Sequence, residues 1–119
     1  MKIRLGEIAH ARSGDKGAAA NVGVVAYTDA GYEILRGALS AEIVEQFFKP
    51  MGVGKVIRYE LPNLLAFNFI LPGILDRGGS LSLRIDAQGK ALGQAILEIE
   101  LEITPEILDK CRRPQRTKS

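Results

Sequence analysis

The hydrophobic positions of this chain change their spacing several times, and each change marks a predicted element. Residues Lys2–Arg12 alternate between apolar and polar positions, as strands do, with a change of register near Gly6 that indicates a bulge. Residues Asn21–Tyr27 are almost wholly apolar, which predicts a strand buried on both faces. The glycines and charges of Ser13–Gly17 predict a loop between the two strands.

Two helices are expected after the second strand. Apolar positions three and four residues apart predict helices over Asp29–Leu39 and Ala41–Lys49. Ser40 directly precedes the second helix, so we expect its hydroxyl to act as the N-cap. Pro50 and Gly52 end the helical pattern.

The second half of the chain returns to strands. Lys55–Leu61 alternates apolar with charged residues, and Pro62–Leu75 fits either a buried strand or a short helix, of which we favour the helix. Ser80–Ile85 and Leu92–Ile103 predict two further strands joined by a turn. After Thr104 the pattern fades into a short helical extension and a frayed tail. The order β-β-α-β-(α)-β-β predicts an α+β two-layer sandwich, with helices on one face of a mostly antiparallel sheet.

Length and charge define one domain with a basic tail. We assign residues 1–104 to the domain and 105–119 to a basic, partly disordered tail. Five basic residues lie in the last ten positions: Lys110, Arg112, Arg113, Arg116 and Lys118. Taking these charges from the net charge of +2 leaves −3 for the rest, and the chain has no Trp, so we expect no nucleic-acid partner.

Composition also limits the location and the metal chemistry. No apolar run reaches the length of about 18 residues that spans a bilayer, and the N-terminus lacks a signal-peptide pattern, so we expect a cytoplasmic protein with no membrane partner. One Cys and one His argue against a transition-metal centre. Glu98, Glu100 and Glu102 share one face of the last predicted strand, but such a stripe is usually solvated. No metal site is predicted, and the pattern specifies no cofactor.

The richest candidate chemistry lies in the run His10–Gly17, which reads HARSGDKG. Gly14 and Gly17 allow backbone N–H groups to converge on an anion, and Arg12 and Lys16 add positive charge. The run therefore favours a site for a phosphate, a carboxylate or a thioester-linked group. Its spacing is not that of a P-loop. A hairpin connection without function is the alternative, because the same residue types are common in turns.

Acid–base chemistry is the second interpretation of this run. His10 and Asp15 could form an acid–base pair, with Asp15 or Asn21 orienting the imidazole. Ser13 lacks a nucleophile-elbow pattern, and Asn68 lies in an apolar stretch where its amide could bind a carbonyl. We predict His10 and Asp15 as catalytic residues. The predicted ligand-binding residues are Arg12, Ser13, Gly14, Lys16, Gly17, Asn21 and Asn68.

Four motifs carry a resemblance to a known family: His10–Gly17, Asn21–Val24, Glu60–Asn63 and Leu83–Lys90. They resemble the small C-terminal domain of the acyclic terpene utilisation (AtuA-like) family, over nearly the whole chain up to about Ile103. The resemblance implies a ferredoxin-like fold. It also implies a role beside the larger domain that this domain follows in some members, in a pathway that degrades terpenoid or branched acids as coenzyme A thioesters.

Three functions are compatible with these observations. The chain is expected to stand alone and to act as a small subunit with a larger AtuA-type chain, contributing to a site for a small anionic substrate. The alternatives are a self-contained lyase or hydratase acting on an acyl thioester, and a non-catalytic, ligand-binding regulatory module. We also expect a homo-oligomer, because many apolar residues must be covered by a single layer of helices.

Overall fold

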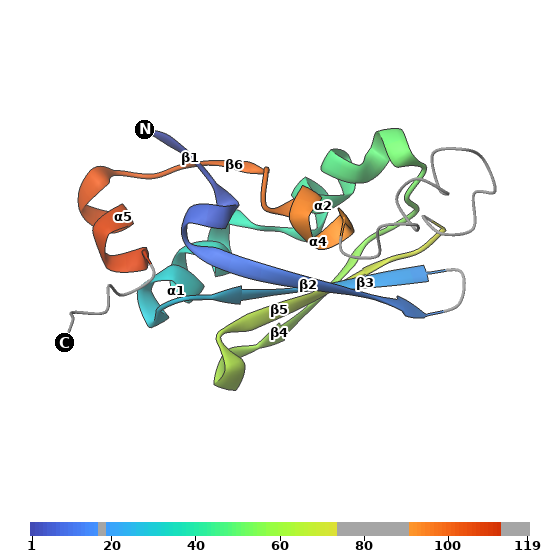
Figure 1. The fold of residues 1–119 in the computed structure, drawn as a ribbon, viewed down its shortest axis with the longest axis horizontal. Helices are drawn as coiled ribbons and strands as arrows, with labels where there is room; N and C mark the ends of the chain where they lie inside the picture. The colour runs from blue at the N-terminus through green and yellow to red at the C-terminus, as the bar shows by residue number, and fades with distance from the viewer. Residues whose placement is uncertain (17–18, 74–90, 113–119) are drawn as a thin grey trace.

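The computed structural model describes residues 1–16, 19–73 and 91–112, which form two antiparallel sheets with helices packed against them (Figure 1). The strands are β1 (Lys2–Arg4), β2 (Ala9–Lys16), β3 (Ala19–Ala26), β4 (Ile57–Leu61), β5 (Ala66–Leu71) and β6 (Glu100–Glu102). The helices are α1 (Asp29–Ala38), α2 (Ala41–Phe48), α4 (Ala91–Ile96) and α5 (Pro105–Cys111). Three 3-10 turns are η1 (Leu5–Glu7), η2 (Lys49–Met51) and η3 (Pro62–Leu64). The predicted α+β class is confirmed.

The larger sheet has the strand order β2-β3-β5-β4, and the helices cover one of its faces. Along β3 burial alternates, so that Ala20, Val22, Val24 and Ala26 are buried while the residues between them are partly exposed. The prediction that this strand is buried on both faces is therefore wrong. Its second face carries small and polar residues that no described helix covers. In Figure 1 the hairpin of β4 and β5 extends away from the helices at its η3 end.

The predicted loop over Ser13–Gly17 is wrong for its first four residues. Strand β2 continues to Lys16, which pairs with Ala19, so the run is one arm of a hairpin; residues 17–18 lie outside the described part. Cross-strand backbone pairing with β3 keeps this polar arm extended. The break in the first predicted strand is confirmed, although the structure has the 3-10 turn η1 there in place of a bulge.

The ambiguous segment after Pro62 is a turn followed by a strand, so the favoured short helix is wrong. The turn η3 ends at Leu65, which has the left-handed φ of 54° and donates its N–H to the carbonyl of Pro62. The chain then reverses into β5, where Phe67 and Phe69 are fully buried. Their period of two was the signal for a strand.

The strand predicted from Leu92 is a helix in its first part and a strand in its last. Leu92 and Ile96, four residues apart, are buried on the inner side of α4. The alternating end forms β6, which pairs with β1 in the two-stranded sheet. The strand predicted at 80–85 lies outside the described residues.

The two predicted helices are present and end within one residue of the predicted positions. The Thr28 hydroxyl accepts the Gly31 N–H at the start of α1, and the Ser40 hydroxyl accepts the Ile43 N–H at the start of α2. Gly52, at φ 86°, ends the turn after α2 in the left-handed conformation that favours glycine. The predicted N-cap role of Ser40 is confirmed.

Helix α5 belongs to the folded core, so a domain boundary at residue 104 cuts across the packing. Its side chains Leu108 and Cys111 are buried, and the Thr28 hydroxyl donates to the Lys110 carbonyl at 2.9 Å. Arg112 forms an ion pair with Glu7 at 3.8 Å. The remainder of the predicted tail, residues 113–119, lies outside the described part.

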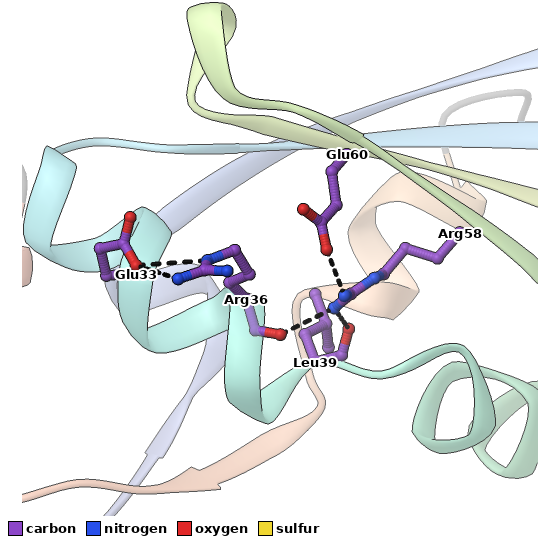
Figure 2. A network of polar contacts seen from close by, with 5 residues as sticks. All are labelled: Glu33, Arg36, Leu39, Arg58 and Glu60. Atoms are coloured by element: carbon purple, nitrogen blue, oxygen red, sulfur yellow. Dashed lines mark hydrogen bonds and ion pairs between the residues drawn. The ribbon is translucent and has the colours of Figure 1, made fainter.

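Arg58 ties β4 to the end of α1 (Figure 2). Its guanidinium donates to the backbone carbonyls of Arg36 at 3.1 Å and Leu39 at 3.0 Å, where the helix leaves carbonyls unpaired. It also forms an ion pair with Glu60 at 2.7 Å and lies 5.1 Å from the centroid of the Phe67 ring. Arg58 therefore lies on the helix-covered face of the sheet.

The apolar residues of β4 face solvent as a consequence. Because side chains alternate along a strand, the inward position of Arg58 directs its neighbours outward. Ile57, Tyr59 and Leu61 are exposed by 47%, 52% and 40%. A charged residue thus faces the covered side of this strand, while its hydrophobic residues are exposed.

We expect Arg58→Ala to lower the free energy of unfolding by about 2 kcal/mol, because it removes charge-assisted hydrogen bonds of roughly 1.5–3 kcal/mol. Urea denaturation measures the change. The control is Arg36→Ala, which removes an exposed ion pair with Glu33. The side-chain hydrogen bond to Glu33 is also the main cause that raises the pKa of Arg36. The control should change stability much less. Equal losses in the two variants would contradict the role of Arg58.

We expect Leu108→Ala to lower the free energy of unfolding by about 2–3 kcal/mol, because it leaves a cavity beneath α5. Removing the residues from Pro114 onward should shift the melting temperature little, since they have no apolar periodicity. Thermal unfolding of the two forms separates the helix from the tail. A large loss on truncation, or none on Leu108→Ala, would show that the division between core and tail is misplaced.

Candidate functional site

Most of the predicted site residues that the structure describes lie on the face of the larger sheet that no described helix covers. Antiparallel pairing aligns them in rows: Arg12 with Gly23, Gly23 with Asn68, and Asn68 with Tyr59. Residues in register share a face of the sheet. We call this surface the open face, and its residues are His10, Arg12, Gly14, Asn21, Gly23, Val25, Ile57, Tyr59, Leu61, Asn68 and Ile70.

Gly23 leaves a space at the centre of the open face. A side chain built at this position would meet no heavy atom within 4 Å. Arg12 on β2 and Asn68 on β5 flank Gly23 in its row. A ligand group above Gly23 would therefore have a guanidinium on one side and an amide on the other.

Two asparagines form a polar bridge beside this space. The Asn21 side-chain amide donates to the Asn68 side-chain carbonyl at 3.2 Å. Gly14 makes room for Asn21, because a Cβ on Gly14 would lie 3.0 Å from Asn21 Oδ1. The bond holds the Asn68 side-chain carbonyl toward Asn21. Among the described residues no acceptor is bonded to the Asn68 side-chain N–H groups, which can therefore donate to a ligand.

His10 occupies the next row of the open face. Its ring is exposed and lies 5.6 Å from the Tyr27 ring, centroid to centroid, at an interplanar angle of 37°. It is two residues from Arg12 along β2, and therefore on the same face. The imidazole can exchange protons with a ligand bound on that face.

Arg12 differs from the other arginines that the structure describes. The others each have a carboxylate within 4 Å: Arg4 with Glu98, Arg36 with Glu33, Arg58 with Glu60 and Arg112 with Glu7. Within the described residues Arg12 has neither an ion pair nor a side-chain hydrogen bond, and it is exposed. Its fork of N–H donors matches a carboxylate or a phosphate.

The remaining predicted residues do not join this group. Ser13 pairs with the buried Val22 and so lies toward the helices. His10 and Asp15 lie on one extended strand, with Cα atoms about 16 Å apart at about 3.3 Å per residue, so this backbone does not support a direct acid–base pair within one chain. The backbone of Lys16 pairs with Ala19. The side chains of residues 15 and 16, and all of residue 17, lie outside the described part.

Sequence reasoning named Gly23 only as part of a motif, and it missed Tyr27 and Tyr59 as neighbours of the site. Gly23 pairs with Arg12, and the Tyr27 ring lies near His10, whereas Tyr59 lies in the same row on β4, two strands beyond Gly23. Only the register between strands shows these positions. The alternation along β3 was a usable signal, since Asn21 and Gly23 interrupt an apolar run with period two.

Other parts of the described structure offer weaker chemistry. A cavity of about 410 Å³ contains Arg4, but Glu98 already pairs with that arginine and Glu7 adds a second carboxylate. Burial raises the pKa of the Cys111 thiol, which keeps it protonated and unreactive. Among the described residues no three His, Cys, Asp or Glu side chains cluster as a metal site, and no helix is long and apolar enough to cross a bilayer.

These features define a small α+β domain with an uncovered, cation-bearing sheet face. The chain belongs to the AtuA ferredoxin-like domain family, whose model matches residues 3–102, and so confirms the resemblance carried by the sequence motifs. The motif at 83–90 lies outside the described residues. No curated protein and no solved structure gave a significant match to the chain.

We expect Gly14→Ala to displace the side chain of Asn21 and weaken its bond to Asn68, because the new methyl group would contact Asn21 Oδ1 at 3.0 Å. The side-chain amide signals of Asn21 in a ¹H–¹⁵N spectrum should shift. Gly23→Ala is the matched control, because its methyl group enters open space and should leave those signals nearly unchanged. Equal shifts in the two variants would show that Gly14 has no special role.

Proposed function

We propose that the open face binds the anionic group of a small organic substrate, with Arg12 as its counter-charge. The observation that carries this proposal is the lack of any carboxylate partner for Arg12 within the described residues, where Arg4, Arg36, Arg58 and Arg112 are all paired. An unpaired guanidinium beside the open space above Gly23 is suited to an incoming carboxylate or phosphate.

The neighbours of Arg12 suit an acyl group. The Asn68 amide N–H groups can donate to a carbonyl oxygen across the space above Gly23, while Arg12 binds an anionic oxygen on the other side. His10 lies one row away and can donate or accept a proton. A carbonyl and an anionic oxygen occur in one ligand in a carboxylic acid that has a second carbonyl group, and in an acyl thioester of coenzyme A, where the pantetheine arm separates the carbonyl from the phosphates.

The proposed site needs a second surface. His10, Arg12 and Tyr59 are exposed, so a substrate on this face would remain in contact with water, and water weakens the charge interactions that catalysis uses. We infer that a larger chain of the acyclic terpene utilisation type covers the face. The chain would then act as a small subunit in the catabolism of terpenoid or branched acids held as coenzyme A thioesters. Family membership supports this partner and this pathway.

A binding experiment with an identified probe tests the proposal. Isovaleryl-coenzyme A is titrated into the chain mixed with the larger AtuA-type chain, and the heat of binding is recorded. We expect Arg12→Ala to weaken binding by about tenfold to a hundredfold, since a charge-assisted hydrogen bond contributes roughly 1.5–3 kcal/mol. Arg12→Lys should restore only part of the affinity, because an ammonium group lacks the planar fork.

Arg4→Ala is the control, because Arg4 is another exposed arginine, on β1, and its charge is already paired with Glu98. It should bind the probe as the native chain does. Equal affinity of the Arg12→Ala variant and the native chain would refute the anion site. Full affinity in the small chain alone, with no gain from the larger chain, would refute the shared site.

A further inference from the structure

The geometry points to a homodimer in which β4 pairs with β4 of a second copy, antiparallel and centred on Tyr59. The larger sheet ends at β4, and among the described residues no strand pairs with its outer edge. An edge strand presents unpaired N–H and C=O groups, which readily pair with another strand. This inference is independent of the proposed anion site.

The edge strand β4 presents apolar side chains on the open face, although its two charged residues, Arg58 and Glu60, face the covered side. Its outward side chains are Ile57, Tyr59 and Leu61, all exposed by 40% or more, and Leu64 just beyond them is exposed by 65%. No proline, lysine or bulge interrupts residues 57–61. An exposed apolar edge of this kind is expected to be covered by a partner strand.

The sequence of β4 selects a second copy of itself as that partner. When two β4 strands pair antiparallel about Tyr59, Ile57 lies opposite Leu61 of the second copy, and the two Tyr59 side chains face each other. On the other side of the sheet Arg58 lies opposite Glu60 of the second copy. Apolar residues thus face apolar residues and each charge faces its opposite, and both arrangements stabilise antiparallel pairs.

Neighbouring registers lose this complementarity. A shift of two residues in one direction sets Arg58 against Arg58, and a shift in the other direction sets Glu60 against Glu60. A shift of one residue places apolar side chains opposite charged ones. Only the register centred on Tyr59 makes the strand complementary to itself, and a two-fold axis requires that self-complementarity.

The dimer would join the two open faces into one. A two-fold axis perpendicular to the sheet keeps both open faces on the same side, and the four strands of each copy continue into an eight-stranded sheet. The edge that pairs is β4, while Arg12 lies on β2 at the opposite edge. Dimerisation therefore leaves the proposed anion site accessible.

Single cysteine variants test both the dimer and its register. Directly opposite residues have Cα atoms about 4.5–5.5 Å apart, within the range of about 4.4–6.8 Å that a disulfide spans. Under mild oxidation Tyr59→Cys should form a covalent dimer in most of the protein. Ile57→Cys alone should not, because its counterpart lies four residues along the strand, about 13 Å away. Mixing Ile57→Cys with Leu61→Cys should restore the cross-link.

Two controls make the outcome decisive. Leu64→Cys is more exposed than Tyr59 but lies outside the paired strand, and the native chain carries only the buried Cys111. Both should remain uncross-linked on a non-reducing gel. A Tyr59→Cys variant that cross-links no faster than Leu64→Cys, or an Ile57→Cys variant that cross-links as well as Tyr59→Cys, would overturn the proposed interface.

Sedimentation of unmodified protein supplies an independent readout. The native chain should sediment as a dimer that dissociates on dilution, and Tyr59→Lys should sediment as a monomer because two ammonium groups would face each other at the axis. Leu64→Lys should behave as the native chain does. A native chain that is monomeric throughout the dilution series would also overturn the inference, whatever its affinity for isovaleryl-coenzyme A.

Discussion

The register of β3 between β2 and β5 is the constraint on which the rest of the structure depends. Val22 and Val24 must face the helices, because burying apolar side chains is the main favourable term in folding. Since the side-chain period of a strand is two, this requirement places Asn21 and Gly23 on the opposite face. A slip of one residue would bury the asparagine and expose the valines.

The same alternation connects the core to the surface chemistry. Pairing with β3 carries the choice of face to β2 and β5, so that Arg12 and Asn68 arrive on either side of Gly23 without any loop to position them. The candidate site is thus built on regular strands, which hold side chains more rigidly than a loop does. Its precision comes from the backbone ladder, and its openness comes from the single layer of helices.

Arg58 shows how one polar contact can decide the character of an edge. The end of α1 leaves carbonyls without partners, and the guanidinium of Arg58 meets two of them while covering the Phe67 ring. That inward position turns the hydrophobic residues of β4 toward solvent. The open face is consequently apolar at its β4 end, while its β2 end carries His10 and Arg12, and these two ends lie at opposite edges of the same sheet.

The sequence by itself determined the α+β class, the helices with the Ser40 cap, the family and most residues of the candidate site. These follow from local periodicity, from capping chemistry and from motifs, all of which act over a few residues. The tertiary structure decided that the run from Ser13 to Lys16 is a strand, that Pro62 begins a turn into β5, and that α4 is helical. Such outcomes depend on pairing and packing between segments far apart in the chain, which can override or settle a local preference. Only those pairings could show that His10 and Arg12 share a face with Asn68, and that Asp15 lies too far along β2 to pair with His10.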